Sequence, residues 1–354
     1  MTSRKRVTIK DVAREAGVSA QTVSRVLNDR PDVSPETYRR VHSIIESIGF
    51  SPNLVARSLT QGRSHVLGVV AYGLDFFGPS RILTGIDRMA AELGYSITLN
   101  VIHEPETGDV GPLLSSLVAR WVDGVIWAIP SVGANRAWTH DEAIDPAAPV
   151  ILVGAQDVGT TIPSIGIDNR EIGQLATTHL LGGGARRVAI VTGPLDWWEA
   201  RERLAGWRAT LQSHGAPADD ELVAVGDWTP ESGRRGLDAL LDRDRGIDAV
   251  FASNDQMALG VQHAAHVRGI RIPEDLSIVG VDNIAESSHF WPPLTTVDQP
   301  LADVGALAVN AMDLALRQPA SGRGSDGGPV LPPSTMLRPQ LVVRQSSRGT
   351  AGSG

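Results

Sequence analysis

The sequence contains no cysteine among its 354 residues. It therefore has no disulfide framework and no thiolate metal site, and this composition fits a reducing compartment such as the cytoplasm. No apolar run approaches the about 20 residues that a membrane-spanning helix requires. The basic residues at positions 4–6 are followed by polar, helix-forming sequence, so we expect no signal peptide. These absences predict a cytoplasmic protein with no membrane partner.

Catalytic motifs are also missing from the sequence. The glycine run at 182–184 has neither the spacing nor the context of a dinucleotide fingerprint. There is no phosphate-binding loop and no Gly-x-Ser-x-Gly nucleophile elbow. The nine histidines are scattered and form no pattern of metal ligands. We therefore expect no catalytic residues, no metal site and no cofactor.

The charge that is present is unevenly distributed. Residues 1–64 carry 11 Lys and Arg against 6 Asp and Glu, whereas the remainder carries 21 against 34 and brings the net charge to −8. A basic head on an acidic body indicates that only the head meets a polyanion. Charge alone leaves open a basic terminus that is merely solvated. The length allows two or three domains with a sizeable core.

The head contains signals for three short helices and for no strand. Residues 8–11 resemble a capping box that opens a first helix, and Gly17 permits the tight turn that follows it. Ser19 can cap a second helix, and Ser34-Pro35 opens a third. This order predicts a helix-turn-helix domain over residues 1–52.

The body, from His65 onward, alternates strand-like and helical patterns. Its apolar, strand-like runs lie at 66–71, 97–102, 124–129, 150–153, 188–192, 222–225, 249–252 and 276–281. Such alternation predicts parallel sheets covered by helices, and the units are too many for one compact sheet. The expected fold class is a small all-α DNA-binding domain plus an α/β core of two parallel-sheet subdomains. Residues 345–354 are expected to form a disordered tail.

The second helix of the head is expected to present polar side chains to DNA. Packing of the apolar positions leaves outward, near its start, Ala20, Gln21, Thr22, Ser24 and Arg25. A recognition helix inserts such N-terminal residues into the major groove, where Gln21 can pair with adenine and Arg25 with guanine. Thr8, Ser19 and Ser24 can hold phosphates. A three-helix bundle without a ligand is the alternative interpretation.

Several motifs along the chain resemble those of one family. They are TIKDVAREAGVSAQTVSRVLN at 8–28, PNLVARSL at 52–59, ARERLAGW at 200–207, GDW at 226–228, SNDQMALG at 253–260 and PPLTT at 292–296. The chain thereby resembles the LacI/GalR family of bacterial transcription regulators, and its lac-type members most. The resemblance extends from about residue 7 to residue 344. It implies a homodimer that binds double-stranded, pseudo-palindromic operator DNA.

The resemblance implies specific roles for residues of the DNA-binding motif. Ala20, Gln21 and Arg25 stand at the positions that set base preference in the family, and Asn28 ends the motif. Many relatives have an aromatic residue at the position of Ala20. We therefore expect an operator that differs from the lac-type one.

The family also implies a hinge helix over residues 53–64. Leu59 corresponds to the leucine that the family wedges into the minor groove, and Ala56 lies on the same helix face. Opening a base step costs a few kcal/mol, which the bent DNA and its additional contacts return. Without the resemblance, this segment would be interpreted as a linker with a small hydrophobic contact.

The body is expected to resemble periplasmic sugar-binding proteins, with a ligand between two subdomains. The N-subdomain is expected at about 65–165 and 298–328, and the C-subdomain at about 166–297 and 329–344. By the family's motifs, the residues that converge on the ligand are Arg203, Asn254, Asp282 and Gln299. Their donors and acceptors suit a polyol. The alternative for each is a strand-end or cap residue that satisfies local backbone groups.

Aromatic and apolar residues are expected to line the rest of this cleft. Trp228 matches a tryptophan of the lac-type members and can stack on the apolar face of a pyranose. Phe76, Pro79 and Ile82 fall where the family lines the opposite wall. Trp197 and its neighbour Trp198 form either a sugar platform or ordinary packing, and the sequence leaves this open.

Two acidic residues compete for one place in the predicted cleft. Spacing favours Glu171, whereas the pair Asp168-Asn169 resembles the general family pattern, and both possibilities stay open. The resemblance predicts a repressor that a small glycoside or galactoside-like inducer releases. A co-repressor, an activating regulator, a sugar-binding protein and a sugar-active enzyme are the alternatives. The C-terminus lacks the leucine heptads of a tetramerising coiled coil, so we expect a dimer.

Overall fold

The computed structural model describes residues 7–27, 33–50, 63–103, 110–132, 135–140, 148–154, 160–244, 246–318 and 330–349. The chain separates into two compact units, Met1–Ser64 and His65–Gly354. No helix in the described part of the chain combines the length and apolarity that crossing a membrane would need.

The described residues of the first unit form three helices, α1 (Ile9–Ala16), α2 (Ala20–Leu27) and α3 (Pro35–Ile48). The backbone N–H of Thr8 donates to the Asp11 carboxylate at 3.0 Å, and Gly17 ends α1 with a φ of 63°. The N–H of Thr22 donates to the Ser19 hydroxyl at 3.0 Å and caps α2. The helix-turn-helix that these signals predict is confirmed.

A small apolar core holds the three helices together. Its buried members are Val12, Ala13, Ala16, Val23, Val26 and Val41. They recur at three- and four-residue spacings on α1 and α2, which places them on one face of each helix. The opposite face of α2 is left for polar contacts.

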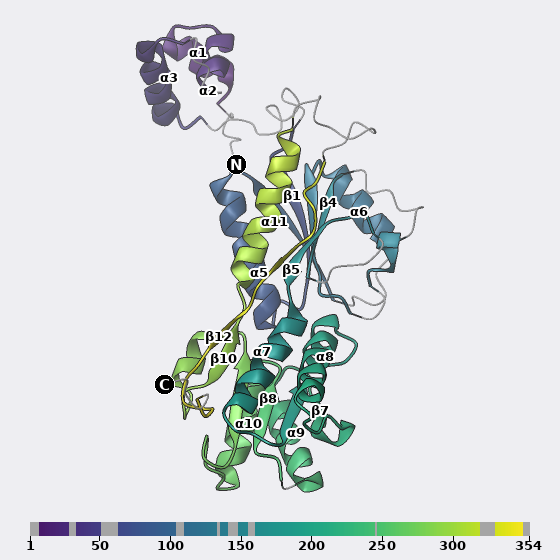
Figure 1. The fold of residues 1–354 in the computed structure, drawn as a ribbon. Coiled ribbons are helices and arrows are strands. Elements are labelled where there is room, and N and C mark those ends of the chain that lie inside the picture. Colours follow the sequence, from purple (N-terminus) through teal and green to yellow (C-terminus); the bar gives the residue numbers. More distant parts are fainter. Residues whose placement is uncertain are drawn as a thin grey trace, which may run out of the picture. The chain divides into compact units, whose positions relative to one another are not determined.

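The second unit is built on two six-stranded sheets (Figure 1). The first has the order β11-β5-β4-β3-β1-β2 and consists of β1 (Val66–Tyr72), β2 (Ser96–Ile102), β3 (Gly124–Ala128), β4 (Val150–Val153), β5 (Ser164–Ile167) and β11 (Thr335–Leu337). The second has the order β12-β10-β9-β8-β6-β7 and consists of β6 (Val188–Thr192), β7 (Val223–Val225), β8 (Ala249–Ala252), β9 (Ser277–Val281), β10 (Thr295–Asp298) and β12 (Gln340–Val342). The pairing is parallel except between β10 and β12. The predicted fold class is thus confirmed.

The N-subdomain consists of the first sheet and three helices, α5 (Phe77–Glu92), α6 (Val110–Ala119) and α11 (Leu301–Leu316). Successive residues of β1 point to opposite faces: Val69 joins the core beneath α5 and α11, and Val70 joins the core beneath α6. The sheet is therefore buried on both sides, which explains the continuous apolar runs in the sequence. Helices α5 and α11 run side by side (Figure 1).

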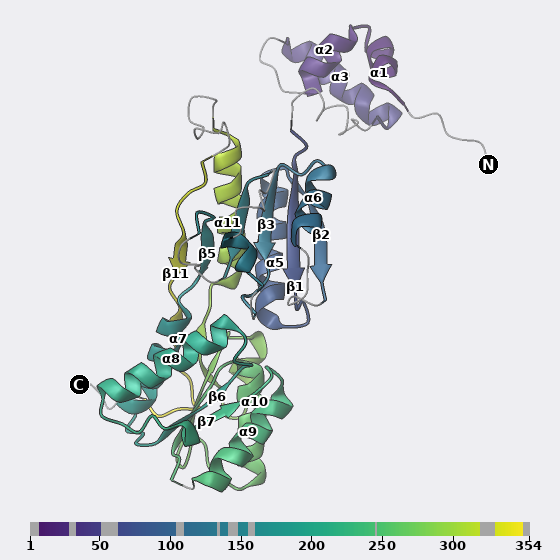
Figure 2. The ribbon, with the colours of Figure 1, turned by 90° about the vertical axis from the view of Figure 1, so that its right-hand side faces the viewer.

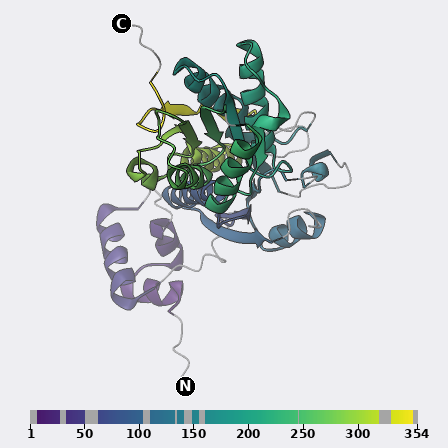
Figure 3. The same cartoon turned by 90° about the horizontal axis from the view of Figure 1, so that it is seen from below.

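The C-subdomain consists of the second sheet and four helices, α7 (Asn169–Gly182), α8 (Trp198–Ser213), α9 (Pro230–Arg243) and α10 (Asp255–Val267). The pair α7 and α8 covers one face of the sheet, and the pair α9 and α10 covers the other (Figure 2). The view along the subdomain shows helices on both sides of the strands (Figure 3). Short 3₁₀ turns lie at Ala137–His140, Asp220–Leu222 and Ala285–His289.

The chain passes between the two sheets three times. It leaves the first sheet after β5, returns after β10, and leaves it again between β11 and β12. The sequence assigned residues 329–344 entirely to the C-subdomain. The structure instead places β11 beside β5 in the N-subdomain and only β12 in the C-subdomain. A strand of three residues has too short a sequence pattern to show which of the two sheets it joins.

The expectation of a disordered tail is wrong for residues 345–349. Ser346 is fully buried, its hydroxyl donates to the Ile278 carbonyl at 2.7 Å, and it accepts from the Thr295 N–H at 2.8 Å. Ser347 lies 2.8 Å from the Nε2 atom of the buried His179. A polar segment is held here because buried backbone groups of the C-subdomain need its hydrogen bonds.

Candidate functional site

Helix α2 presents its polar face to solvent. Gln21 and Arg25 are exposed, whereas Val23 and Val26 on the opposite face are buried. Exposed Gln21 and Arg25 lie four residues apart, so their side chains emerge on the same side of the helix. This is the arrangement that base recognition by a helix in the major groove requires.

The remaining residues predicted to contact DNA flank this face. Thr8 and Ser19 are exposed at the starts of α1 and α2, where the N–H groups of a helix end can receive a phosphate. Ala20, Thr22 and Ser24 are half-buried. The predictions for Asn28, Ala56 and Leu59 fall outside the described residues.

A cavity of about 110 Å³ lies where the N- and C-subdomains meet. That volume exceeds the about 10–15 Å³ that one water molecule needs. Its walls include the residues predicted to contact an effector, namely Phe76, Pro79, Ile82, Trp197, Arg203, Trp228, Asn254, Asp282 and Gln299. They come from both subdomains and from the segments that connect them. The structure therefore brings together residues spread over more than half of the sequence.

Arg203 is the centre of the polar network in this cavity. It is buried, its Nε donates to the Asn169 side chain at 2.8 Å, and one terminal nitrogen donates to the Gln299 side chain at 3.2 Å. The other terminal nitrogen donates to the Ser253 carbonyl. Burial lowers the pKa of Arg203, and the charge of Asp282 opposes this shift. A rigid guanidinium thus ties the two connecting segments to the end of β8.

Asp282 follows β9 and accepts a hydrogen bond from the Gln299 side chain. Its carboxylate is buried, and its backbone has a φ of 111°, a conformation that non-glycine residues rarely adopt. Burial raises the pKa of Asp282 to about 6, while the charge of Arg203 lowers it. Strain of this kind concentrates at functional sites. Asp282 therefore places a buried hydrogen-bond acceptor at the carboxyl end of β9.

Asn254 lines the cavity, but its side chain forms hydrogen bonds with backbone groups of the protein. Its Oδ1 accepts from the Met257 N–H at 2.8 Å and caps α10, and its Nδ2 donates to the Trp228 carbonyl at 3.0 Å. The cap interpretation that the sequence offered thus describes its contacts in this structure. The same contacts hold the backbone of Trp228, which has a φ of 70°.

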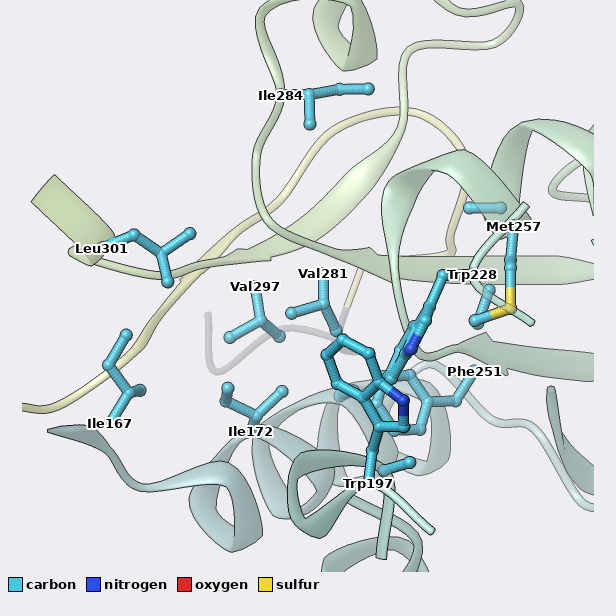
Figure 4. Close-up of a cluster of buried hydrophobic side chains, with 14 of the residues drawn as sticks. Ile167, Ile172, Trp197, Trp228, Phe251, Met257, Val281, Ile284, Val297 and Leu301 are labelled. Atoms are coloured by element: carbon cyan, nitrogen blue, oxygen red, sulfur yellow. The ribbon is translucent and has the colours of Figure 1, made fainter. Parts of the chain in front are cut away.

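Three aromatic side chains form one wall of the cavity. The rings of Trp197 and Trp228 are 5.7 Å apart between centroids, and that of Phe76 lies 5.5 Å from Trp197, both in edge contacts. Figure 4 shows the Trp197 ring beside the Trp228 ring. Trp197 lines the cavity and Trp198 does not, which separates the two tryptophans that the sequence left together.

The two acidic residues that competed in the sequence both lie outside the cavity lining. Asp168 is exposed and accepts from the Glu171 N–H at 2.9 Å, so it caps α7. Glu171 follows in the first turn of that helix. Their neighbour Asn169 turns inward instead and holds Arg203.

The lining residues that the sequence reasoning missed include two polar ones that matter for the site, Asn169 and Glu199. The Asp168-Asn169 pair, which resembles the family pattern, is the signal that could have found Asn169. Glu199 gave no local signal, since an acid in the first turn of a helix is ordinary. Within the described ranges, no group of three His, Cys, Asp or Glu side chains could hold a metal ion.

Family models match both units of the chain. Residues 8–53 match the model for bacterial regulatory proteins of the lacI family, and residues 177–347 match that for a periplasmic binding protein-like domain. The catabolite control protein A of Priestia megaterium is 34% identical over 308 residues, which cover 86% of this chain and 91% of that protein.

Solved structures repeat this similarity over nearly the whole chain. The lac repressor dimer bound to operator and an anti-inducer superimposes with a TM-score of 0.81 at 31% identity, covering 97% of this chain and 99% of that one. The complex of the regulator CelR with cellobiose gives 0.68 at 29% identity, covering 97% and 100%. CelR of Thermobifida fusca is 32% identical over 361 residues, covering 98% of this chain and 100% of that protein.

Proposed function

The chain belongs to the LacI family of bacterial DNA-binding regulatory proteins, and on that premise we propose that it is a repressor released from a palindromic operator by a small saccharide. The family is one of regulators rather than enzymes. Because the operator lies on the chromosome, the proposal places the protein in the cytoplasm. Asp168 and Glu171 have no part in it, since their side chains lie outside the cavity.

The observation that carries the proposal is the cavity beneath Trp228. Arg203, Asp282 and Gln299 form one buried network beside two tryptophan rings. Carboxylate, guanidinium and amide groups suit the paired hydroxyls of a sugar, and an aromatic ring suits its apolar face. A relative of the same length and fold binds cellobiose. A glycoside or galactoside-like inducer is the effector that this lining favours.

Recognition of the operator is assigned to Gln21 and Arg25 of α2, supported by Thr8, Ser19, Ala20, Thr22 and Ser24. Asn28 and the hinge residues Ala56 and Leu59 are included by the family resemblance alone. A homodimer matches a palindromic site, because two-fold symmetry in the protein mirrors that of the DNA.

An exposed apolar patch in the C-subdomain supports the dimer. Trp291 is 91% exposed and Val267 is 69% exposed, and Leu259 lies on the same helix as Val267. Gln262 of that helix donates to the Pro292 carbonyl, which brings Trp291 beside it. Exposed apolar side chains gathered on one element and its neighbour are the kind of surface that interaction sites use. The lac repressor, which this chain resembles, is a dimer in its complex with operator.

The test is an operator gel shift with and without saccharides. The operator is selected from genomic fragments, and saccharides that raise the melting temperature are then added to the complex. We expect release of the DNA, with Arg203→Lys preserving operator binding but responding to saccharide at least about tenfold less, because an ammonium lacks the guanidinium fork. Tighter DNA binding on adding the saccharide would establish the co-repressor alternative. An unchanged response in Arg203→Lys would remove Arg203 from the site.

A further inference from the structure

Glu199 brings a buried, unpartnered carboxylate oxygen to the cavity. It lies in the first turn of α8, and its Oε2 atom is buried without a hydrogen-bond partner in the described part of the chain. Its Oε1 atom lies 3.5 Å from the place where a Cβ on Gly154 would stand, and Gly154 also lines the cavity. An unmade hydrogen bond to a buried charged group is costly, so this oxygen is expected to have a partner in the working state.

The charges around Glu199 do not provide that partner. Burial raises the pKa of Glu199, and a hydrogen bond from its own backbone N–H opposes the shift, followed by the charges of Arg136, Arg203 and Arg201. All three side-chain nitrogens of Arg203 already donate to protein acceptors. Arg136 and Arg201 likewise donate to backbone carbonyls, so the Oε2 atom of Glu199 accepts from no described group and is left to accept from a molecule in the cavity.

The lining residues include a second unpartnered polar atom, and this one is a hydrogen-bond donor. The Nε1 atom of Trp228 is buried and donates to no acceptor within the described ranges. Two residues of the lining thus carry an unpartnered polar atom, an acceptor in Glu199 and a donor in Trp228. A hydroxyl group can both donate and accept, and so it complements both atoms.

An anionic ligand does not complement this lining. A phosphate ester carries a charge of about −1.5 to −2 at pH 7 and accepts hydrogen bonds without donating to a carboxylate. It would face the carboxylates of Glu199 and Asp282, with Arg203 as the only Lys or Arg among the lining residues that the structure describes. Like charges brought together in a buried site cost several kcal/mol.

We propose that Glu199 accepts a hydrogen bond from a hydroxyl group of the effector, and that this contact restricts the cavity to uncharged saccharides. Phosphorylated sugars and sugar acids are rejected, because their anionic groups donate no hydrogen bond to the Glu199 carboxylate and are repelled by its charge. This inference rests on the proposed function and narrows its ligand class. It also gives a function to a charge that lowers the stability of the ligand-free fold.

Calorimetric titration of the full-length protein tests the ligand class. The probes are cellobiose, lactose and glucose, each beside its 6-phosphate. We expect an uncharged probe to bind and its phosphate to bind at least about 100-fold more weakly. Glu199→Gln should weaken binding of the uncharged probe about 10- to 150-fold, the range for one hydrogen bond to a charged group. In the same variant, the difference in affinity between the uncharged probe and its 6-phosphate should be smaller than in wild type.

The matched control is Glu202→Gln on the same helix. Glu202 pairs with Arg170 at 3.0 Å and lies outside the cavity, so its neutralisation should leave binding unchanged. Equal or tighter binding of the phosphate, or wild-type affinity in Glu199→Gln, would overturn the role of Glu199. Failure of all probes, with wild-type protein that binds operator, would defeat the saccharide proposal itself and the inference with it.

A melting experiment without ligand separates a functional from a structural role. An unpaired buried carboxylate destabilises the folded state at pH values where it is ionised. Glu199→Gln is therefore expected to raise the melting temperature by a few degrees at pH 8 and by less at pH 4. A lower melting temperature at pH 8 would show that Glu199 serves the fold and would contradict the proposal.

Discussion

At the scale of single residues, a buried carboxylate lies behind the cavity lining, between the lining residues Asn254 and Gln256 in the sequence. Asp255 begins α10 and is fully buried, and it accepts from the Thr296 hydroxyl at 2.6 Å and from the Ile284 N–H at 3.0 Å. Burial and the charge of the nearby Asp282 raise the pKa of Asp255 to about 8. Its two hydrogen bonds lower the pKa again, but they offset only part of this increase. Asp255 therefore ties β10 and the segment after β9 to α10 at a cost in stability near neutral pH.

This cost predicts how stability depends on pH. An acid whose pKa is 3.8 when unfolded and about 8 when folded binds more protons in the folded state between those values. Its contribution to the free energy of unfolding is present below pH 3.8 and is lost as the pH rises to about 8. At about 1.4 kcal/mol per pKa unit, the loss amounts to several kcal/mol.

Asp255→Asn is expected to flatten this dependence, because the amide carries no charge; its oxygen can accept from the Ile284 N–H, and its nitrogen can donate to the Thr296 hydroxyl oxygen. Urea unfolding at pH 5 and pH 8 measures the effect. Wild type should lose more stability than the variant between the two pH values. A steeper loss in the variant would contradict the prediction.

At the scale of elements, close helix packing positions the site. Gly206 of α8 approaches α7 so tightly that an added Cβ would lie 2.1 Å from the Arg170 carbonyl oxygen. Arg203 lies one turn before Gly206, and Asn169 begins α7. The same contact that packs the two helices therefore sets the distance between the Arg203 and Asn169 side chains.

Gly206→Ala is expected to lower the free energy of unfolding by about 1–3 kcal/mol, because a backbone oxygen cannot give way. It should also weaken the response to saccharide by displacing Arg203. The control, for stability alone because Gly78 lines the cavity, is Gly78→Ala in α5, where an added Cβ meets nothing within 4 Å. There, stability should stay unchanged or rise by up to about 1 kcal/mol, since alanine favours the helix. Denaturant unfolding measures the free energy of unfolding of both variants. Equal stability of the two variants would contradict the role of close packing at Gly206.

The elements also show what a local pattern can predict. All eight apolar runs of the body became strands. Central strands such as β1, β3 and β6 are buried on both faces, which requires continuous apolar sequence. Strands β5, β10, β11 and β12 were not predicted, and they have three or four residues each. Helix α11 is buried on most of its surface, so its sequence carries little amphipathic pattern by which it could be predicted.

At the scale of the whole molecule, two functions are assigned to two units of the chain. The residues proposed to read the operator lie in the first unit, and those proposed to bind the effector lie in the second. A ligand can shift the affinity for DNA only by its differential affinity for two states of the protein. Mutations should therefore separate operator affinity from ligand affinity.

Arg25→Ala is expected to weaken operator binding by about 1–3 kcal/mol, because it removes one bidentate contact to a base. The melting shift on adding saccharide should stay as in wild type. Arg208→Ala, which removes an exposed charge paired with Asp220 in the body, is the matched control and should leave operator affinity unchanged. Gel shifts and melting curves measure both quantities. Loss of the saccharide response in Arg25→Ala would contradict the separation.

The sequence alone determined the helix-turn-helix, the α/β alternation and the strand-end residues Asp282 and Asn254. These features rest on caps, periodicity and burial, which act over a few residues and are written in local sequence. Only the tertiary structure decided that Asn169 and Glu199 enter the cavity while Asp168 caps a helix, and that Ser346 is buried. The physical reason is that a cavity at the meeting of two sheets is lined by residues far apart in the chain. Their inward or outward direction depends on how the three connecting segments pack, which no local pattern encodes.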